Sequence, residues 1–263
     1  MKIMKKYYFL QRVVRQFLVI ATILFSGLHY AKANEINVSA AISLSNAFKE
    51  IAALYEAKHP MDKILFNFGA SGSLLQQIDQ GAPTDIFASA DEETMDQAVK
   101  KGLIIENSRK DFTNNSLVLI APIHSNLDIH NAGNLLQPTV QKIAVGQPKI
   151  VPAGRYTQKF LQQNQLWDKL QNKLIIGQNV RQVLDYVARD EVNVGFVYHS
   201  DATILSNKVK ILLDFPLSHS IRYPIALVKQ KTENTKAQGF IDFILSSTGQ
   251  NILNKYGFTS VSR

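Results

Sequence analysis

The sequence predicts an α/β protein with two lobes, each built on a mostly parallel sheet that is flanked by helices. From residue 34 onward, short apolar segments with strand character alternate with segments that have helical periodicity. The alternation runs through two successive sets in about 230 residues, and repeated βαβ units form parallel sheets with helices on both faces. We therefore assign residues 34–114 and 225–263 to the first lobe and residues 115–224 to the second, with Pro224 near one of two hinge crossings.

The first set of segments begins with a buried strand at residues 36–40. Ser43 or Ser45 can cap the helix that follows, in which apolar residues recur at helical spacing. Strands are also expected in this set at residues 64–68 and 85–88, with a tight turn at residues 69–73. Residues 74–79 are expected to begin a second helix, and residues 92–101 to form a third.

The second set repeats this rhythm. Strands are expected at residues 117–121, 142–145, 174–176, 194–197 and 209–213, and helices at residues 153–163 and 180–190. A last apolar strand at residues 223–228 and two helices at residues 235–245 and 249–256 close the chain.

The first 33 residues have the features of a secretory signal peptide. A basic segment precedes an apolar run at residues 17–25, and Ala31-Lys32-Ala33 offers small residues at the two positions that a signal peptidase recognises. The apolar run is short for a membrane span, although an uncleaved anchor is the alternative. We expect cleavage before Asn34 and a mature protein outside the cytoplasm, where ATP and NAD are scarce, which excludes most nucleotide-dependent enzymes.

Charge and cysteine content narrow the classes further. The formal net charge is +8, but residues 1–33 carry six Lys/Arg and no Asp/Glu, so the remainder carries about +2. Without a basic face that carries aromatic side chains, no nucleic-acid partner is expected. The chain has no cysteine, which excludes a lipoprotein anchor, a cysteine nucleophile and a cysteine metal site. A freely diffusing exported protein needs a second membrane to retain it, so we expect a periplasmic location.

Four turns that precede helices share a chemistry, at residues 41–43, 69–73, 151–154 and 178–180. Each offers free backbone N–H groups at the positive end of a helix dipole, and two add a serine hydroxyl. In α/β folds, ligands bind beyond the carboxyl ends of the strands, where such turns lie. A single serine before a helix is usually only a cap, but several converging turns of this kind form an anion-binding site.

Motifs of catalysis do not emerge from the sequence. The histidines after the signal segment show no paired metal-ligand spacing, and no His-Glu-x-x-His, Gly-x-Ser-x-Gly, P-loop or Gly-x-Gly-x-x-Gly motif occurs. His199-Ser200-Asp201 are adjacent along the chain, which does not by itself make a triad. We therefore expect a binding protein without a cofactor rather than an enzyme. The alternative from another class is an exported hydrolase with Ser71 as its nucleophile.

A series of motifs, which keeps its order along nearly all of the mature chain, resembles the periplasmic molybdate-binding proteins of ABC importers. The motifs are Ala40-Ala41-Ile42-Ser43-Leu44, Phe68-Gly69-Ala70-Ser71-Gly72-Ser73-Leu74, Gly81-Ala82-Pro83-Thr84-Asp85-Ile86-Phe87-Ala88-Ser89-Ala90-Asp91, Asn115-Ser116-Leu117-Val118, Ala144-Val145-Gly146-Gln147-Pro148, Val151-Pro152-Ala153-Gly154, Asn179-Val180-Arg181, Gly195-Phe196-Val197-Tyr198-His199-Ser200-Asp201-Ala202 and Tyr256-Gly257-Phe258. The resemblance implies a periplasmic binding protein of the type II kind, with the ligand in the cleft between its lobes.

The resemblance also implies which residues bind the oxyanion, all of them as uncharged donors. Ser43 and Ser71 would donate hydroxyl and backbone N–H groups. Ala153 and Val180 would each donate a backbone N–H, and Tyr198 would donate its phenol O–H. They would contact molybdenum only through its oxo groups. Mild departures from the family pattern at Ser39, Ile42 and Gly72 bear on local packing more than on ligand contacts.

Donors without charge suit molybdate, a tetrahedral dianion whose four oxygens only accept hydrogen bonds. Hydrogen phosphate carries a proton that stays unpaired in a donor-only cleft, at a cost of about 1–3 kcal/mol. Sulfate is also unprotonated and must be rejected by cavity size, since molybdate and tungstate are larger. We expect the ligand to be molybdate and also tungstate, with another oxyanion such as sulfate as the alternative.

The resemblance implies an inner-membrane ABC permease and its ATPase as partners, and a monomer as the binding form. Arg155 and Arg181 lie near two of the donor turns, and arginine is a natural clamp for oxyanions. A surface or lobe-bridging role is the alternative for both, and the sequence leaves this choice open.

Overall fold

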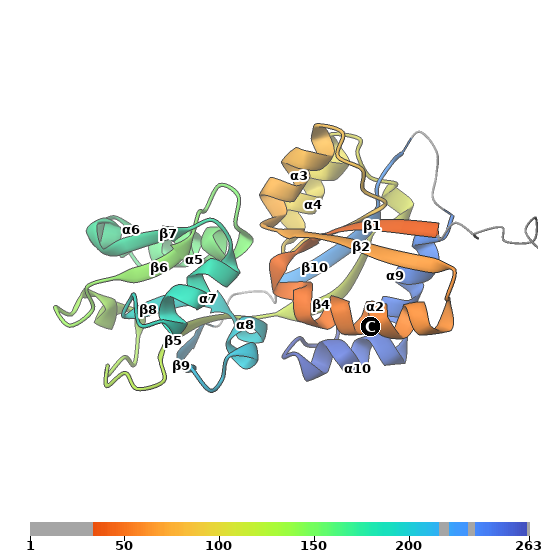
Figure 1. Ribbon diagram of the computed structural model, residues 1–263. Coiled ribbons are helices and arrows are strands. Elements are labelled where there is room, and N and C mark those ends of the chain that lie inside the picture. Colours follow the sequence, from red (N-terminus) through yellow and green to blue (C-terminus); the bar gives the residue numbers. More distant parts are fainter. Residues whose placement is uncertain (1–33, 216–220, 231–234, 262–263) are drawn as a thin grey trace, which may run out of the picture. The chain divides into compact units, whose positions relative to one another are not determined.

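The computed structural model describes residues 34–215, 221–230 and 235–261. Their strands form two five-stranded sheets flanked by helices, which confirms the two-lobed α/β fold class (Figure 1). The expected signal peptide at residues 1–33 lies outside the described residues. Within the described ranges, no helix has the length and apolar character needed to cross a membrane.

The first lobe is built on a sheet of strand order β2-β1-β3-β10-β4. β1 is parallel to β2 and β3, whereas β10 lies between β3 and β4 and is antiparallel to both. Helices α3 and α4 contact each other on one face of this sheet, and α2, α9 and α10 contact one another on the other face (Figure 1). The elements are β1 (Asn34–Ala41), β2 (Asp62–Gly69), β3 (Ile86–Ala88), β4 (Lys110–Asn115), β10 (Ile221–Leu227), α2 (Ser45–Lys58), α3 (Ser71–Asp79), α4 (Glu92–Lys100), α9 (Ala237–Leu245) and α10 (Ser247–Lys255).

The second lobe is built on a sheet of strand order β7-β6-β8-β5-β9. β6 is parallel to β7 and β8, and β5 is antiparallel to its neighbours β8 and β9. The elements are β5 (Leu117–Pro122), β6 (Ile143–Gly146), β7 (Leu174–Gly177), β8 (Val194–Tyr198), β9 (Val209–Phe215), α5 (Pro152–Gln163), α6 (Trp167–Leu170), α7 (Val180–Ala188) and α8 (His199–Ile204).

Both sheets have the same strand order, and in each four strands run in one direction and one runs against them. In each, three parallel strands are followed by a strand that enters the lobe directly after a crossing, β10 in the first sheet and β5 in the second. These entering strands run opposite to their neighbours on both sides. The predicted mostly parallel sheets are therefore confirmed, and the one reversed strand in each sheet is the strand that follows a crossing.

The two crossings define where the chain passes between the lobes. Only Ser116 separates β4 from β5, and the whole of β10 from Ile221 belongs to the first sheet. The expected lobe limits at residues 114 and 224 therefore fall inside β4 and β10, and Pro224 lies in the middle of β10, near the crossing that precedes this strand. The assignment of residues 34–114 and 225–263 to the first lobe and of residues 115–224 to the second stays a proposal. In the structure, Asn115 and residues 221–224 belong to strands of the first sheet.

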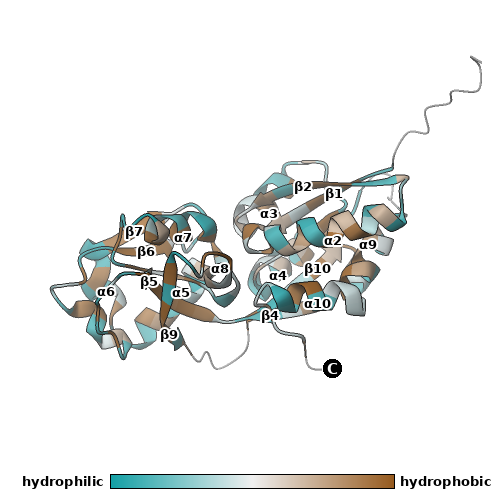
Figure 2. Cartoon of the chain, turned by 60° about the horizontal axis from the view of Figure 1, so that its bottom comes forward, coloured by the Kyte–Doolittle hydropathy of each residue, from teal (hydrophilic) through white to brown (hydrophobic). Residues whose placement is uncertain are grey.

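Apolar faces of the helices pack on the sheets to form the core. Phe48 of α2 is fully buried and lies within 5.8 Å of Phe112 and 6.4 Å of Phe240, measured between ring centroids. Figure 2 shows β1 and β5 as mainly hydrophobic, with hydrophilic residues along the outer side of α2 and α10. Burial of this kind stabilises each lobe by about 25 cal/mol per Å² of apolar surface.

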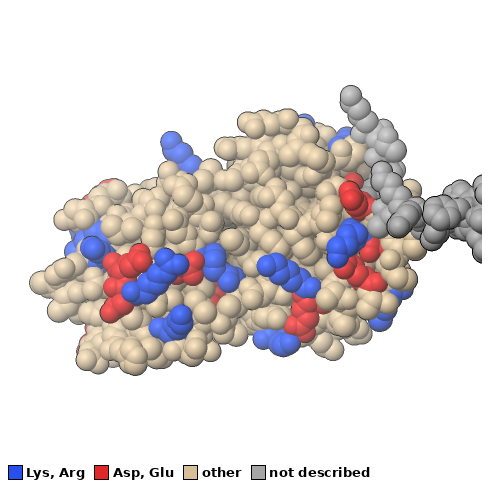
Figure 3. Space-filling model, in the orientation of Figure 1, with Lys and Arg blue, Asp and Glu red and all other residues tan. Residues whose placement is uncertain are grey.

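The surface mixes charges of both signs. Figure 3 shows basic and acidic side chains next to one another on the face drawn, and pairs such as Lys63–Glu56 and Lys255–Glu50 join opposite charges. The expectation that no nucleic acid binds stays a prediction.

Candidate anion-binding pocket

The five residues that the family resemblance predicts as ligand contacts line a single small pocket. Ser43 and Ser71 come from the first lobe, and Ala153, Val180 and Tyr198 come from the second. All five are buried. The structure thus brings together every predicted site residue, at the carboxyl ends of strands of both sheets.

Four of these residues lie at the beginnings of helices. Ser71 and Val180 are the first residues of α3 and α7, Ala153 is the second residue of α5, and Ser43 lies in the 3-10 helix η1 (Ile42–Leu44) ahead of α2. N–H groups in the first turn of a helix have no partner within the helix, and the dipole makes this end positive. The turns therefore present four sets of backbone donors to one small space.

Local sequence explains why the helices begin there. α5 begins at Pro152, whose fixed φ suits a first helical position and whose missing N–H costs nothing there. The Asn179 side chain caps α7 by accepting the N–H of Gln182 at 2.9 Å. This cap occupies a deeper N–H group and leaves the N–H of Val180, at the very start of the helix, to the pocket.

The oxygen of Ser71 is held by a hydrogen bond from the backbone. Oγ accepts the backbone N–H of Ala90 at 3.0 Å, so the hydroxyl proton remains to donate. The neighbouring N–H of Gly72 donates to the carbonyl of Ile150 in the second lobe at 3.0 Å. A Cβ at position 72 would lie 2.8 Å from Cα of Ile150, so glycine permits this close approach of the two backbones.

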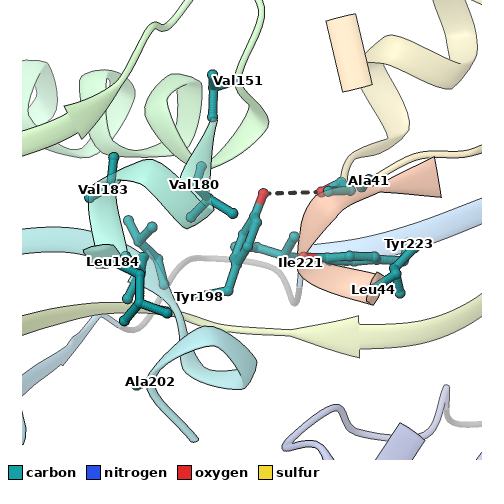
Figure 4. Packing of buried hydrophobic residues seen from close by; sticks show 14 of the residues in the cluster. Ala41, Leu44, Val151, Val180, Val183, Leu184, Tyr198, Ala202, Ile221 and Tyr223 are labelled. Atoms are coloured by element: carbon teal, nitrogen blue, oxygen red, sulfur yellow. Dashed lines mark hydrogen bonds between the residues drawn. The ribbon is translucent and has the colours of Figure 1, made fainter. Parts of the chain in front are cut away.

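Tyr198 reaches the pocket from the end of β8 and crosses to the first lobe. Its phenol O–H donates to the carbonyl of Ala90 at 3.2 Å, and Figure 4 shows the ring directed from the second lobe toward the Ala41 turn. Burial raises the pKa of Tyr198 well above its ordinary value, so the phenol keeps its proton at neutral pH. Its single proton is therefore shared between a protein acceptor and any ligand.

Arg155 bridges the lobes. Its Nε and Nη2 donate to Oδ2 of Asp91 at 3.1 and 2.8 Å, and Nη2 also donates to Oγ1 of Thr94 at 2.9 Å. Asp91 is itself the cap of α4 in the first lobe. The sequence leaves open whether Arg155 clamps the oxyanion or has a surface or lobe-bridging role, and these contacts match the lobe-bridging role.

Arg181 also reaches across the lobes, through a hydrogen bond from Nη2 to Oδ1 of Asn46 at 3.2 Å. On its other side it lies 3.8 Å from Oδ1 of Asp201, a carboxylate with no exposed surface. Burial raises the pKa of Asp201 from its ordinary value of 3.8 to about 6, against the opposing effect of the Arg181 charge. Both arginines therefore interact with carboxylates of the protein, Arg155 with Asp91 and Arg181 with Asp201.

The raised pKa of Asp201 predicts a stability that depends on pH. The native state holds this proton more tightly than the unfolded state, so the contribution is present below pH 4 and is lost as the pH rises through about 6. Relative to the wild type, Asp201→Asn should gain about 2–3 kcal/mol in unfolding free energy between pH 4 and pH 7. Urea unfolding at both pH values measures this difference.

The exposed Asp242→Asn serves as the control for the pH series, since it removes a carboxylate from the surface of α9. The pH profile of Asp201→Asn should depart from the profile of this surface variant across the same interval. Equal pH profiles for Asp201→Asn and the wild type would contradict the prediction.

Sequence reasoning missed three residues that complete the site: Ala90, Asn115 and Tyr223. Ala90 and Asn115 lie within motifs that carry the family resemblance, so their positions were visible although their contacts were not. Tyr223 contacts Ser43 from 180 positions away along the chain, and no local pattern marks it.

Comparison with known proteins places the chain among bacterial binding proteins. Residues 36–259 match the family described as bacterial extracellular solute-binding protein. The molybdate-binding protein ModA of Escherichia coli is 37% identical over 242 residues, which cover 89% of this chain and 92% of that protein. ModA of Haemophilus influenzae is 34% identical over 239 residues, covering 89% of this chain and 93% of that protein.

A solved structure agrees in fold. The substrate-binding domain of a putative molybdenum ABC transporter from Clostridium difficile is 37% identical, with a TM-score of 0.66, and the match covers 87% of this chain and 99% of that one. The resemblance seen in the sequence motifs is thereby confirmed. This chain belongs to the bacterial extracellular solute-binding proteins, in the same family as the molybdate-binding proteins to which it is similar.

Proposed function

We propose that this protein captures molybdate, and also tungstate, and delivers the oxyanion to an ABC importer. The observation that carries the proposal is the buried pocket in which Ser43, Ser71, Ala153, Val180 and Tyr198 meet from both lobes. Relatives with 34–37% identity that are named as molybdate-binding proteins support the same ligand.

The proposed binding relies on neutral donors. A dianion in the pocket would accept hydrogen bonds from the two serine hydroxyls and from the N–H groups at the starts of η1, α3, α5 and α7. Tyr198 would share its phenol proton between the carbonyl of Ala90 and the charged oxygen of the ligand, so this carbonyl stays occupied. Arg155 and Arg181 contribute by holding the lobes together around the ligand rather than by clamping it.

Ser71 fits the role of a donor better than that of a nucleophile. A serine nucleophile needs a general base within hydrogen-bond reach. Among the described residues, the hydrogen bond found at Oγ of Ser71 comes from the backbone N–H of Ala90, which is a donor and takes no proton. We propose a binding protein without catalytic activity and without a cofactor.

We further propose that residues 1–33 direct export and are removed, that the mature chain acts as a monomer in the periplasm, and that the form with both lobes on the ligand docks on an inner-membrane permease served by an ATPase. Ligand contacts from two lobes favour the closed state over the open one.

Calorimetric titration of the mature protein with sodium salts of oxyanions tests the proposed ligand. Molybdate and tungstate should bind at micromolar concentrations or below, and hydrogen phosphate at least about tenfold more weakly, because its proton finds no acceptor. Sulfate tests the alternative, since only cavity size rejects it. Failure to bind molybdate and tungstate, or tighter binding of sulfate, would defeat the proposal.

A further inference from the structure

Two buried side chains outside the pocket lining, Asn115 and Tyr223, are linked to Ser43 by hydrogen bonds. Asn115 ends β4, Tyr223 lies on β10, and their exposed fractions are 6% and 0%. Nδ2 of Asn115 lies 3.2 Å from the phenol oxygen of Tyr223, and that oxygen lies 3.1 Å from Oγ of Ser43. The three polar groups form a chain of hydrogen bonds that ends at the pocket wall.

The orientation of the Asn115 amide is fixed by its backbone partners. Its Oδ1 accepts the N–H groups of Ser116 at 3.0 Å and of Ser200 at 3.4 Å, and a backbone N–H can only donate. Nδ2 therefore faces the two hydroxyl oxygens, that of Ser200 at 2.8 Å and that of Tyr223. Asn115 is thus a donor to Tyr223.

Donation by Asn115 sets the direction of the next bond. The phenol oxygen of Tyr223 already receives an N–H, so its own proton is directed to Oγ of Ser43. In the opposite arrangement the oxygen would receive two protons, and the phenol proton would stay unpaired inside the protein, which is costly. Burial also raises the pKa of Tyr223 well above its ordinary value, so the phenol remains protonated.

When the oxygen of Ser43 receives the Tyr223 proton, the hydroxyl keeps its own proton and one lone pair. Among the described residues, no other acceptor for that proton lies within hydrogen-bond distance, and Ser43 lines the pocket, so the proton is left for an acceptor there. On the basis of the proposed function, we infer that Asn115 and Tyr223 are positioning residues that make the Ser43 hydroxyl a fixed donor to the oxyanion and so disfavour oxyanions that carry a proton.

Ser71 shows the same arrangement by other means. The backbone N–H of Ala90 occupies its oxygen just as Tyr223 occupies that of Ser43. In both pocket hydroxyls an incoming hydrogen bond, one from the backbone and one from a side chain, removes that partner as an acceptor for the serine proton and so favours donation to the pocket. A hydroxyl without such a partner could donate its proton to the protein and turn a lone pair to the proton of hydrogen phosphate.

A double-mutant cycle tests the relay. Tyr223→Phe keeps the ring and removes only the hydroxyl, and it should lower molybdate affinity about three- to tenfold. In the Ser43→Ala background the same change should have less than about a twofold effect, because the phenol acts through Ser43. Calorimetry supplies the affinities, and thermal unfolding confirms that each variant is folded.

Tyr55→Phe is the matched control. It removes another buried phenol hydroxyl of the first lobe, which donates to Oδ2 of Asp62 at 3.1 Å and lies on α2 outside the pocket lining. Its molybdate affinity should equal that of the wild type. An equal loss from Tyr223→Phe with and without Ser43 would overturn the inference, whereas a wild type that binds no molybdate would overturn the proposed function and the inference with it.

Specificity gives a second readout that a purely structural role would not move. At pH 8 phosphate is mainly a dianion with one proton, and in Tyr223→Phe the Ser43 hydroxyl is no longer held by the phenol and can turn a lone pair to that proton. The ratio of molybdate to phosphate affinity, measured by competition, should fall at least about threefold. An unchanged ratio would overturn the assigned role in specificity.

Discussion

Val180→Pro is expected to lower molybdate affinity about 10- to 100-fold while leaving the protein folded. Under the proposed arrangement, the N–H of Val180 donates to an oxygen of the ligand. A hydrogen bond to a charged group contributes about 1.5–3 kcal/mol, and its loss leaves a ligand oxygen unpaired. Calorimetric titration of the variant with molybdate measures the loss.

The fold should tolerate this proline because of where it lies. Val180 is the first residue of α7, and proline is favoured at this position since its missing N–H has no partner in the helix. The residue before a proline is driven to extended backbone, which Asn179 already has at φ −159° and ψ 168°. Few positions allow one backbone donor to be deleted with so little disturbance.

Val180→Ala is the matched control, because it shortens the side chain and keeps the N–H. It should cost some stability, since Val180 is 4% exposed, and leave molybdate affinity within about threefold of the wild type. Equal affinities for the proline and alanine variants would show that this N–H takes no part in binding.

Gly154→Ala is expected to destabilise the second lobe by at least about 3 kcal/mol and to abolish tight binding. Gly154 is the third residue of α5 and packs directly on the end of β6. A Cβ at this position would lie 1.9 Å from the carbonyl oxygen of Gly146 and 2.5 Å from its carbon. Backbone atoms cannot rotate away, so α5 must shift and carry the N–H of Ala153 with it.

Chemical unfolding and calorimetry check this prediction together. Gly239→Ala in α9 is the control, since it also adds a methyl group within a helix but meets only the end of the Tyr55 side chain, at 3.1 Å. The control should unfold within about 1 kcal/mol of the wild type. A stable Gly154→Ala variant with wild-type affinity would show that the contact of α5 with β6 does not position the donor.

The sequence predicted most of the elements because their signals are local. Apolar runs marked the buried strands, and small or hydroxyl residues ahead of helical periodicity marked the donor turns. β4 was missed because its residues Lys110–Asn115 are mostly polar and pair with β10, a strand about 110 positions later. The polar residues of β4 do not show that this segment is a strand, and nothing in its sequence indicates a pairing partner so far along the chain.

In the candidate site, too, local features could be predicted from the sequence and contacts between distant segments could not. Ser43, Ser71, Ala153 and Val180 lie in turns that can be read from neighbouring residues, whereas Tyr198 at the end of β8 was predicted from the family resemblance, and the pocket contains all five. The side chains that hold and orient these donors depend on contacts between distant segments, such as Arg155 with Asp91 and Asn115 with Tyr223, which are 64 and 108 positions apart. A polar residue can have many roles on a protein surface, so the sequence alone did not show that these side chains hold the donors.

The placement of β10 between β3 and β4 has a consequence for the order of assembly. A chain that emerges from its amino end can complete the second sheet, which needs nothing after Phe215, before the first. Until residues 221–227 arrive, β3 and β4 present open edges that would pair with any extended segment. Tyr223 arrives on that same strand, so the last strand to join the sheet also delivers the group that orients Ser43.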